Sequence, residues 1–107
     1  MTVAEPAFAR IWRGRAVKEK ADAYERYWLA TGVDPLIKKG AIKVEMLRED
    51  RESESEFVTI SYWASIEEMA PDGGDPTLTH HLPEDAEYLI EIPHRVQILR
   101  ILETRGA

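Results

Sequence analysis

Apolar and polar positions along the chain alternate with two periods, which together predict four strands and two helices. In a strand, successive side chains point to opposite faces, so a half-buried strand repeats every two residues, whereas a helix repeats every three to four. The strands are expected at residues 8–15, 41–47, 57–63 and 95–102. The helices are expected at about residues 18–31 and from residue 66 to just before Pro71. The predicted order is therefore β-α-β-β-α-β, an α+β ferredoxin-like arrangement.

The first helix has the clearest pattern. Five residues recur at three- and four-residue spacing and share one face: Ala21, Tyr24, Tyr27, Trp28 and Thr31. Gly32 is a suitable stop, with a further turn through Leu36 and Ile37 after Pro35. The second helix is predicted from a capping box, in which Ser65 is the N-cap and Glu68 follows three residues later.

Three segments are predicted to be connections. The densely charged run from Arg48 to Glu56 is expected to be a solvated hairpin turn. The segment 72–76 contains two glycines but lacks the lysine and the spacing of a phosphate-binding loop, so it is expected to be a plain turn. The longer stretch from Thr77 to Pro93 enlarges the last connection, and Pro83 with the acids after it can start a helical turn there.

The strands carry apolar residues on both faces. Val58, Ile60 and Tyr62 lie on one face of their strand, and Phe57 and Trp63 lie on the other. Because two helices can cover only one face of a small sheet, the other face must meet something apolar, most economically a second copy of the chain. The expected assembly is a homodimer with a cavity beside or between the sheets.

Composition narrows the class of protein. The 107 residues suit a single domain with a core at about residues 8–102. The net charge of −6 argues against binding to nucleic acid, whose phosphates need lysine and arginine. The absence of cysteine excludes thiolate chemistry and disulfides. The start lacks the features of a signal peptide, and no apolar run approaches the ~20 residues of a membrane span, so a cytoplasmic protein without a membrane partner is expected.

Two adjacent histidines are the most conspicuous polar pair. An imidazole can act as a general base near neutral pH or as a metal or haem ligand. Since adjacent residues of an extended segment point in opposite directions, at most one of His80 and His81 is expected to face a cavity, and a surface role is the alternative for each. The nearby acids match no metal motif, so no metal site is predicted.

Aromatic side chains are the second candidate feature. Trp12 and Trp63 lie in predicted strands, where they can line the uncovered face or pack into the core. Phe57 and Tyr88 are further candidates for a pocket wall. Arg10 shares a face with Trp12, and a strand arginine among buried neighbours needs an anionic partner, either an acid at an interface or a substrate anion.

Three segments together resemble the antibiotic biosynthesis monooxygenase family of the dimeric α+β barrel superfamily. The opening segment, residues 9–14, is similar to the family's first strand. Residues 61–67 resemble its tryptophan at the end of the third strand followed by a serine-capped helix. Residues 81–89 resemble a proline-acid-acid-aromatic segment of uncharacterised members. The resemblance implies a ferredoxin-like protomer and a dimer closed by packing of sheet on sheet.

The resemblance also implies candidate chemistry. Some members of the family oxidise phenols with dioxygen and no cofactor, and others degrade haem with an asparagine, a tryptophan and a histidine. Trp63 matches that tryptophan and His80 or His81 that histidine, while the chain contains no asparagine.

The leading hypothesis is a monooxygenase-like protein that oxidises an aromatic or phenolic small molecule without a cofactor. Its candidate catalytic residues are His81, His80, Trp63 and Arg10, and its candidate pocket residues are Trp12, Phe57 and Tyr88. The alternatives are a haem-binding or haem-degrading protein and a non-catalytic dimer that binds a small molecule.

Overall fold

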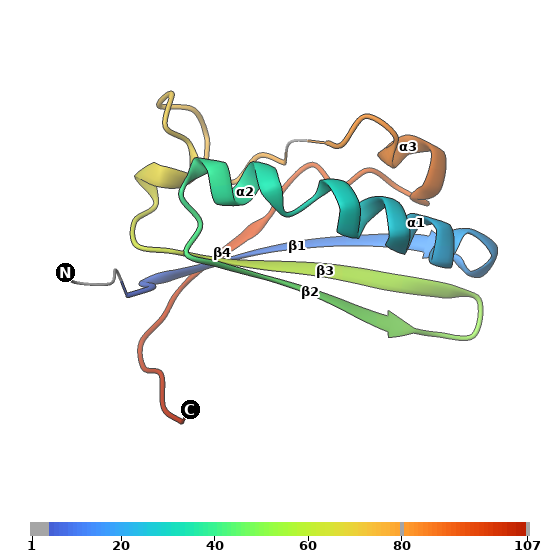
Figure 1. Cartoon of the computed structure of the whole chain (residues 1–107), viewed down its shortest axis with the longest axis horizontal. Coiled ribbons are helices and arrows are strands. Elements are labelled where there is room, and N and C mark those ends of the chain that lie inside the picture. Colours follow the sequence, from blue (N-terminus) through green and yellow to red (C-terminus); the bar gives the residue numbers. More distant parts are fainter. Residues whose placement is uncertain (1–4, 80, 107) are drawn as a thin grey trace.

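One four-stranded antiparallel sheet forms the base of the molecule in the computed structural model, which describes residues 5–79 and 81–106. The strands are β1 (Phe8–Val17), β2 (Lys43–Asp50), β3 (Glu54–Trp63) and β4 (Gln97–Arg100), in the order β2-β3-β1-β4. The central pair, β1 and β3, is aligned over ten residues, from Phe8 opposite Trp63 to Val17 opposite Glu54. This sheet with helices on one face confirms the predicted α+β ferredoxin-like fold (Figure 1).

The helices and the long connection all lie on the same side of the sheet (Figure 1). The helical elements are α1 (Lys18–Thr31), α2 (Asp34–Lys39), the 3-10 turn η1 (Glu67–Met69) and α3 (Asp85–Tyr88). The predicted face of α1 is the one that packs on the sheet, since Ala21, Tyr24 and Trp28 are buried. No helix of the described residues is long and apolar enough to cross a membrane.

The second predicted helix is wrong in form. The segment after Ser65 makes only η1, and no side chain caps it, so the capping box does not form. Pro71 follows directly and cannot continue a helix, and Gly73 with its positive φ of 79° then turns the chain. The cover that this helix was expected to give comes from α2 and from the connection that includes α3 (Figure 1).

The turn within the charged run from Arg48 to Glu56 is also shorter than predicted. Strand β2 continues to Asp50 and β3 begins at Glu54, so only residues 51–53 turn, closed by the Arg51 N–H donating to the Glu54 carbonyl at 2.8 Å. Arg51 in the turn accounts for this, because it pairs with Glu49 and Glu56, which face each other across the two strands and would otherwise repel. Arg51 lies 2.7 Å from Glu49 and 3.2 Å from Glu56.

The register shows which strand residues face the helices. The buried face of β3 carries Ser55, Phe57, Thr59, Ser61 and Trp63. Trp12 lies opposite Thr59 on β1 and therefore shares this face. Of the two alternatives for Trp12 and Trp63, the structure supports packing into the core, because the helices cover their side of the sheet. The uncovered face instead carries Ile11, Leu47, Val58, Ile60, Tyr62 and Leu99.

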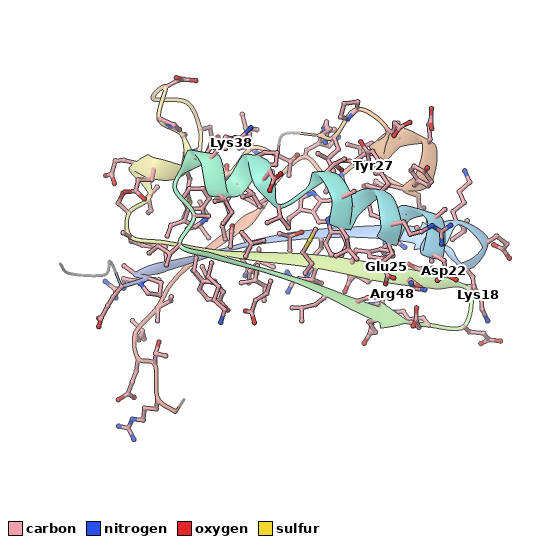
Figure 2. The ribbon with its side chains drawn as sticks, viewed as in Figure 1. Lys18, Asp22, Glu25, Tyr27, Lys38 and Arg48 are labelled. Carbon is pink, nitrogen blue, oxygen red and sulfur yellow. The ribbon has the colours of Figure 1, made fainter. Side chains whose placement is uncertain are left out.

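Charged pairs fasten the first helix to the sheet edge. Arg48 on β2 reaches across to Asp22 and Glu25 on α1, with N–O distances of 2.9 and 3.1 Å (Figure 2). Its guanidinium also lies 5.4 Å from the Phe57 ring centroid, in the range of a cation–π contact. These contacts fix α1 over the half of the sheet next to the pocket described below.

Candidate ligand pocket

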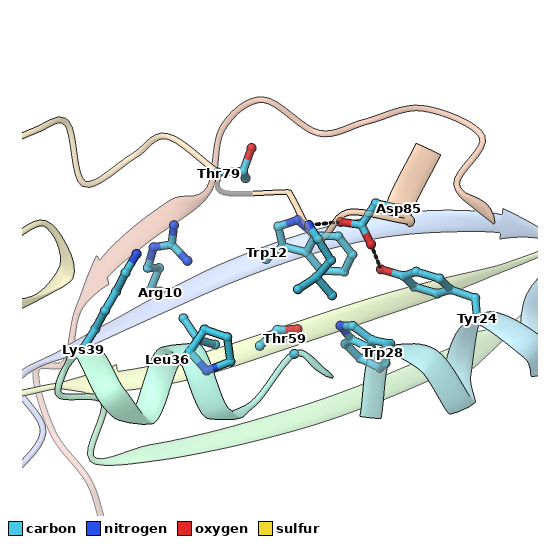
Figure 3. A pocket seen from close by; sticks show the side chains of 12 residues that line it. Arg10, Trp12, Tyr24, Trp28, Leu36, Lys39, Thr59, Thr79 and Asp85 are labelled. Carbon is cyan, nitrogen blue, oxygen red and sulfur yellow. Dashed lines mark hydrogen bonds between the residues drawn. The ribbon is translucent and has the colours of Figure 1, made fainter. Parts of the chain in front are cut away.

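A pocket of about 100 Å³ lies between the covered face of the sheet, helices α1 and α2, and the connection above them (Figure 3). Strand β1 contributes Arg10 and Trp12, and β3 contributes Thr59. The helices contribute, among others, Tyr24, Trp28, Leu36 and Lys39, and the connection contributes Thr79, Leu82 and Asp85. Most of this lining is aromatic or aliphatic, which is typical of small-molecule sites.

Aromatic rings form one wall of the pocket. The rings of Trp12 and Trp28 are 6.1 Å apart between centroids, and Trp28 stacks on Tyr24 at 6.2 Å. A glycine explains the position of Trp12, because a Cβ at Gly14 would lie only 2.5 Å from the far end of the Trp12 indole. The indole therefore lies across the bare backbone of Gly14, the close approach for which a strand uses glycine.

Two cationic side chains, Arg10 and Lys39, lie together at one end of the pocket (Figure 3). Burial lowers the pKa of Arg10, and burial together with the charge of Arg10 lowers the pKa of Lys39. In the part of the chain that the structure describes, neither side chain forms an ion pair with a carboxylate. Two positive charges thus face the same space without an ion pair to a described carboxylate, although Asp72 is near enough to oppose the lowering of the Lys39 pKa.

Backbone carbonyls orient one of these cations. The Arg10 guanidinium donates to the carbonyl of Pro76 at 3.4 Å and to that of Leu78 at 3.0 Å. Asp75 in turn holds this loop, because its carboxylate accepts hydrogen bonds from the backbone N–H of Thr77 at 2.9 Å and from the Arg95 guanidinium at 2.6 Å. These bonds from Thr77 and Arg95 lower the pKa of Asp75 to about 2. The loop is therefore a fixed support for Arg10.

A buried carboxylate lies at the other end of the pocket (Figure 3). Asp85 is only 3% exposed, and its Oδ1 accepts a hydrogen bond from the Tyr24 hydroxyl at 3.1 Å. Its Oδ2 accepts one from the backbone N–H of Leu82 at 2.9 Å. Burial and the adjacent Asp85 raise the pKa of Tyr24 well above its ordinary value, so Tyr24 keeps its proton and remains the donor.

The structure brings two of the residues singled out from the sequence into this pocket and leaves most of the others outside. Arg10 and Trp12 line it, whereas Phe57 and Trp63 are fully buried in the packing beneath the helices. Phe57 meets the rings of Tyr24 and Trp28 edge-on from behind the pocket wall.

Trp63, Tyr88 and the histidines have other surroundings. Trp63 donates from Nε1 to the Ser61 hydroxyl at 2.9 Å. Tyr88 stacks on Tyr27 at 5.7 Å, outside the pocket lining. His81 is exposed and lies edge-on to His94 at 6.3 Å. His80 lies outside the described residues.

Sequence reasoning missed the polar residues at both ends. Tyr24 and Trp28 were expected to pack α1 on the sheet, and they do so while also forming the pocket wall. Lys39 has no distinguishing signal, because it is one of two adjacent lysines at the end of a short helix. Asp85 was noted only as an acid after Pro83, and nothing in its local sequence marks it as buried.

The described residues do not provide a haem or metal site in this pocket. Among the residues that the structure describes, no histidine lines the pocket, and the cavity is far smaller than the ~300–1,000 Å³ of pockets for drug-sized ligands. Among the residues whose placement is described, no group of three or more histidines or acids is arranged to hold a metal ion. The remaining chemistry is that of an aromatic pocket with a cationic end and an acidic end.

Comparisons with known proteins place the fold in a structural group. No family model matches the sequence, and no curated protein matches it. A solved structure of a Bacillus cereus protein named "putative antibiotic biosynthesis monooxygenase" superposes with a TM-score of 0.65 at 14% identity, covering 96% of this chain and all of the other. PA3566 from Pseudomonas aeruginosa superposes with a TM-score of 0.58 at 17% identity, covering 97% of this chain and all of the other. The chain therefore shares the α+β fold of these two solved structures.

Proposed function

We propose that this protein binds a small anionic aromatic molecule in the pocket and oxidises it with dioxygen, without a bound cofactor. The observation that carries the proposal is the pairing of Arg10 and Lys39, two cations without an ion pair to a described carboxylate, at the end of an aromatic-lined cavity. Arg10 and Lys39 are partly buried, and a ligand anion would offset the repulsion between their two charges. The shared fold supports an oxygenase-like activity by analogy, which is a weaker argument than the pocket itself.

The proposed chemistry needs no outside reductant. In the proposed reaction, dioxygen reacts with a phenol whose ring position para to the hydroxyl carries a hydrogen. The phenol loses the hydroxyl hydrogen, and one oxygen atom replaces the hydrogen at the para carbon. The products are a quinone and water, which contains the second oxygen atom. The enclosed aromatic wall excludes bulk water, and the two cations hold the electron-rich anion in place. The histidine expected in this role is replaced by Lys39 in the proposal, since His81 is exposed and away from the pocket.

Oxygen uptake tests this proposal directly. Single-ring phenols are incubated with the protein in an oxygen electrode, and labelled dioxygen is used to follow one oxygen atom into the quinone. Arg10→Gln and Lys39→Met are expected to lower the rate at least about tenfold, whereas Lys38→Met, an exposed neighbour outside the pocket (Figure 2), is the matched control. If no phenol is consumed although aromatic acids bind, the protein is a non-catalytic binding protein and the oxidation proposal fails.

We also propose that the working form is a homodimer joined through the uncovered face of the sheet. This face carries six apolar side chains, and no described segment covers it: Ile11, Leu47, Val58, Ile60, Tyr62 and Leu99. Residues 101–106 leave the sheet on this uncovered side (Figure 1), and Leu102 there is 81% exposed. Arginines of β1 and glutamates of β3 share the face, so its charges can pair with those of an identical surface.

A further inference from the structure

The two ends of the pocket have opposite chemical character. Arg10 and Lys39 lie at one end and Asp85 with Tyr24 at the other, with the Trp12 indole between them (Figure 3). A ligand that spans the pocket therefore meets hydrogen-bond donors with positive charge at one end and acceptors at the other. A neutral or purely anionic ring would satisfy only one of these ends.

The acidic end has spare capacity to accept hydrogen bonds. Each oxygen of an ionised carboxylate can accept about two hydrogen bonds. In Asp85, Oδ1 accepts one from Tyr24 and Oδ2 accepts one from the Leu82 N–H, and no described cation forms an ion pair with it. A buried carboxylate gains from a further donor, and a ligand hydroxyl is a donor that fits an aromatic cavity.

The cationic end is built for a carboxylate rather than a hydroxyl. Arg10 uses its Nε and one Nη2 hydrogen on the Pro76 and Leu78 carbonyls, which leaves other N–H groups of its fork to donate. Arginine recognises planar carboxylates through such a fork, and Lys39 adds a point charge beside it. The size of the cavity, about 100 Å³, limits the ligand to a single ring.

We propose that the pocket selects a single-ring phenol bearing a carboxylate, with the carboxylate on Arg10 and Lys39 and the hydroxyl donating to Asp85. This inference rests on the proposed function for the identity of the site and adds its substrate class. Asp85 polarises the hydroxyl toward the phenolate and so increases the electron density of the ring. Tyr24 acts as a positioning residue, because it holds the Asp85 carboxylate and has no proposed contact with the ligand.

Binding measurements with a ligand series test the proposal without requiring turnover. The probes are 3-hydroxybenzoate, whose ring position para to the hydroxyl is free, its methyl ester, which lacks the charge, and benzoate, which lacks the hydroxyl. Titration calorimetry with the full-length wild-type protein is expected to give at least about tenfold tighter binding of a hydroxybenzoate than of its ester. The hydroxybenzoate is also expected to bind several-fold more tightly than benzoate. Equal affinities of acid and ester, or no binding by any probe, overturn the proposal.

Variants test which end of the pocket binds the carboxylate of the ligand and which end binds its hydroxyl. Lys39→Met and Arg10→Gln are expected to remove the advantage of the acid over its ester, with Lys38→Met as the control that retains it. Asp85→Asn is expected to reduce the advantage of hydroxybenzoate over benzoate while leaving the affinity for benzoate largely unchanged. Because Asp85 is buried and its variant can fail to fold, the wild-type comparison of hydroxybenzoate with benzoate decides the point independently.

The failure of this inference differs from the failure of the oxidation proposal. Selective binding of hydroxybenzoates without oxygen uptake supports the substrate class and removes the oxidation. Oxygen uptake with neutral phenols at the same rate as with their carboxylated analogues supports oxidation and removes the substrate class.

Discussion

At the scale of single residues, the charge state of Lys39 controls how the pocket holds an anion. Its pKa is lowered by burial and by Arg10, and the nearby Asp72 opposes this shift. A bound anion favours the charged lysine, so affinity is complete below the pKa of the free pocket and falls as the pH rises through it. Because that pKa is depressed, the loss begins below the ordinary lysine value of about 10.4.

This argument gives a pH prediction that can be checked by titration calorimetry. Benzoate is the suitable probe because its own charge does not change in the alkaline range. Its affinity is expected to fall between neutral pH and about pH 10, whereas the weaker binding to Lys39→Met is expected to be flat over the same range. A parallel decline in both proteins would place the titrating group elsewhere.

Gly14 is the residue that sets the position of the pocket wall. A methyl group at Gly14 would lie 2.5 Å from the Trp12 indole, so Gly14→Ala is expected to push the ring out of its place. The strain falls on the far end of one side chain, so a loss of about 1–3 kcal/mol in unfolding free energy is expected, together with a clear change in tryptophan fluorescence and ligand affinity. Gly74→Ala is the control, since a Cβ there meets no atom within 4 Å. Unchanged ligand affinity in Gly14→Ala would show that the Trp12 indole does not contribute to ligand binding.

Replacing Trp63 tests whether this residue has a structural role or the catalytic role expected from the sequence. It is fully buried and bonded to Ser61, away from the pocket lining. Trp63→Phe is expected to lower the unfolding free energy by about 1–3 kcal/mol, through the lost hydrogen bond and imperfect packing, and to leave ligand affinity unchanged. Chemical denaturation and calorimetry measure the two effects separately. A large drop in oxygen uptake at unchanged stability would restore the catalytic role.

At the scale of elements, the sequence predicted the sheet and the first helix well because their signals are local. The two-residue alternation in β3 and the helical spacing of Tyr24 and Trp28 each lie within one element. The second helix, which was expected to be short and to end before Pro71, forms only as the 3-10 turn η1, and no side chain caps it. The hairpin turn was overestimated because its charges pair across strands, a relation that spacing along the chain does not reveal.

The pocket was harder to predict because its residues come from five separate segments. Arg10 and Trp12 were recognised through their shared strand face, but which face the helices cover depends on packing. Lys39 and Asp85 are 46 positions apart in the numbering and belong to elements without a strong pattern. They line the same pocket because the long connection folds back over α1, and no local sequence signal indicates that fold.

The loop that supports Arg10 gives a prediction at this scale. Asp75→Asn removes the charge that holds Arg95, and the loop carbonyls that accept from Arg10 are expected to become less ordered. Affinity for a hydroxybenzoate is expected to fall about two- to fivefold, with little change in affinity for its methyl ester. Glu52→Gln, an exposed acid in the hairpin turn outside the pocket lining, is the comparison. Equal losses for acid and ester would indicate general damage to the pocket.

At the scale of the whole molecule, the uncovered face of the sheet predicts the effect of a buried charge. If two copies meet there, Ile60→Glu places a charge in their interface, and the protein is expected to become monomeric in analytical ultracentrifugation. Leu29→Glu is the control, because Leu29 is exposed on α1, on the opposite side of the molecule. A wild-type protein that is already monomeric at micromolar concentration would refute the dimer.

The connection above the pocket is attached differently from the rest of the fold. It meets the sheet through one isolated bridge, from Ala16 to Leu89, and a second bridge, from Leu78 to Arg95, joins two parts of the connection itself. A segment held in this way opens with a smaller free energy than the central strands, so its amide protons exchange with solvent first. The cover of the pocket is thus also its most readily opened part.

Ligand binding should therefore slow the amide hydrogen exchange of the segment that covers the pocket. A ligand that must leave when the cover opens, present at 100 times its Kd, slows exchange of the Ile90 amide, which donates to the Arg15 carbonyl of β1, about 100-fold. The Arg51 amide in the hairpin turn, whose opening leaves the pocket intact, keeps its rate. The frequency with which the weakly attached cover opens then sets the upper limit on how fast ligand enters and product leaves.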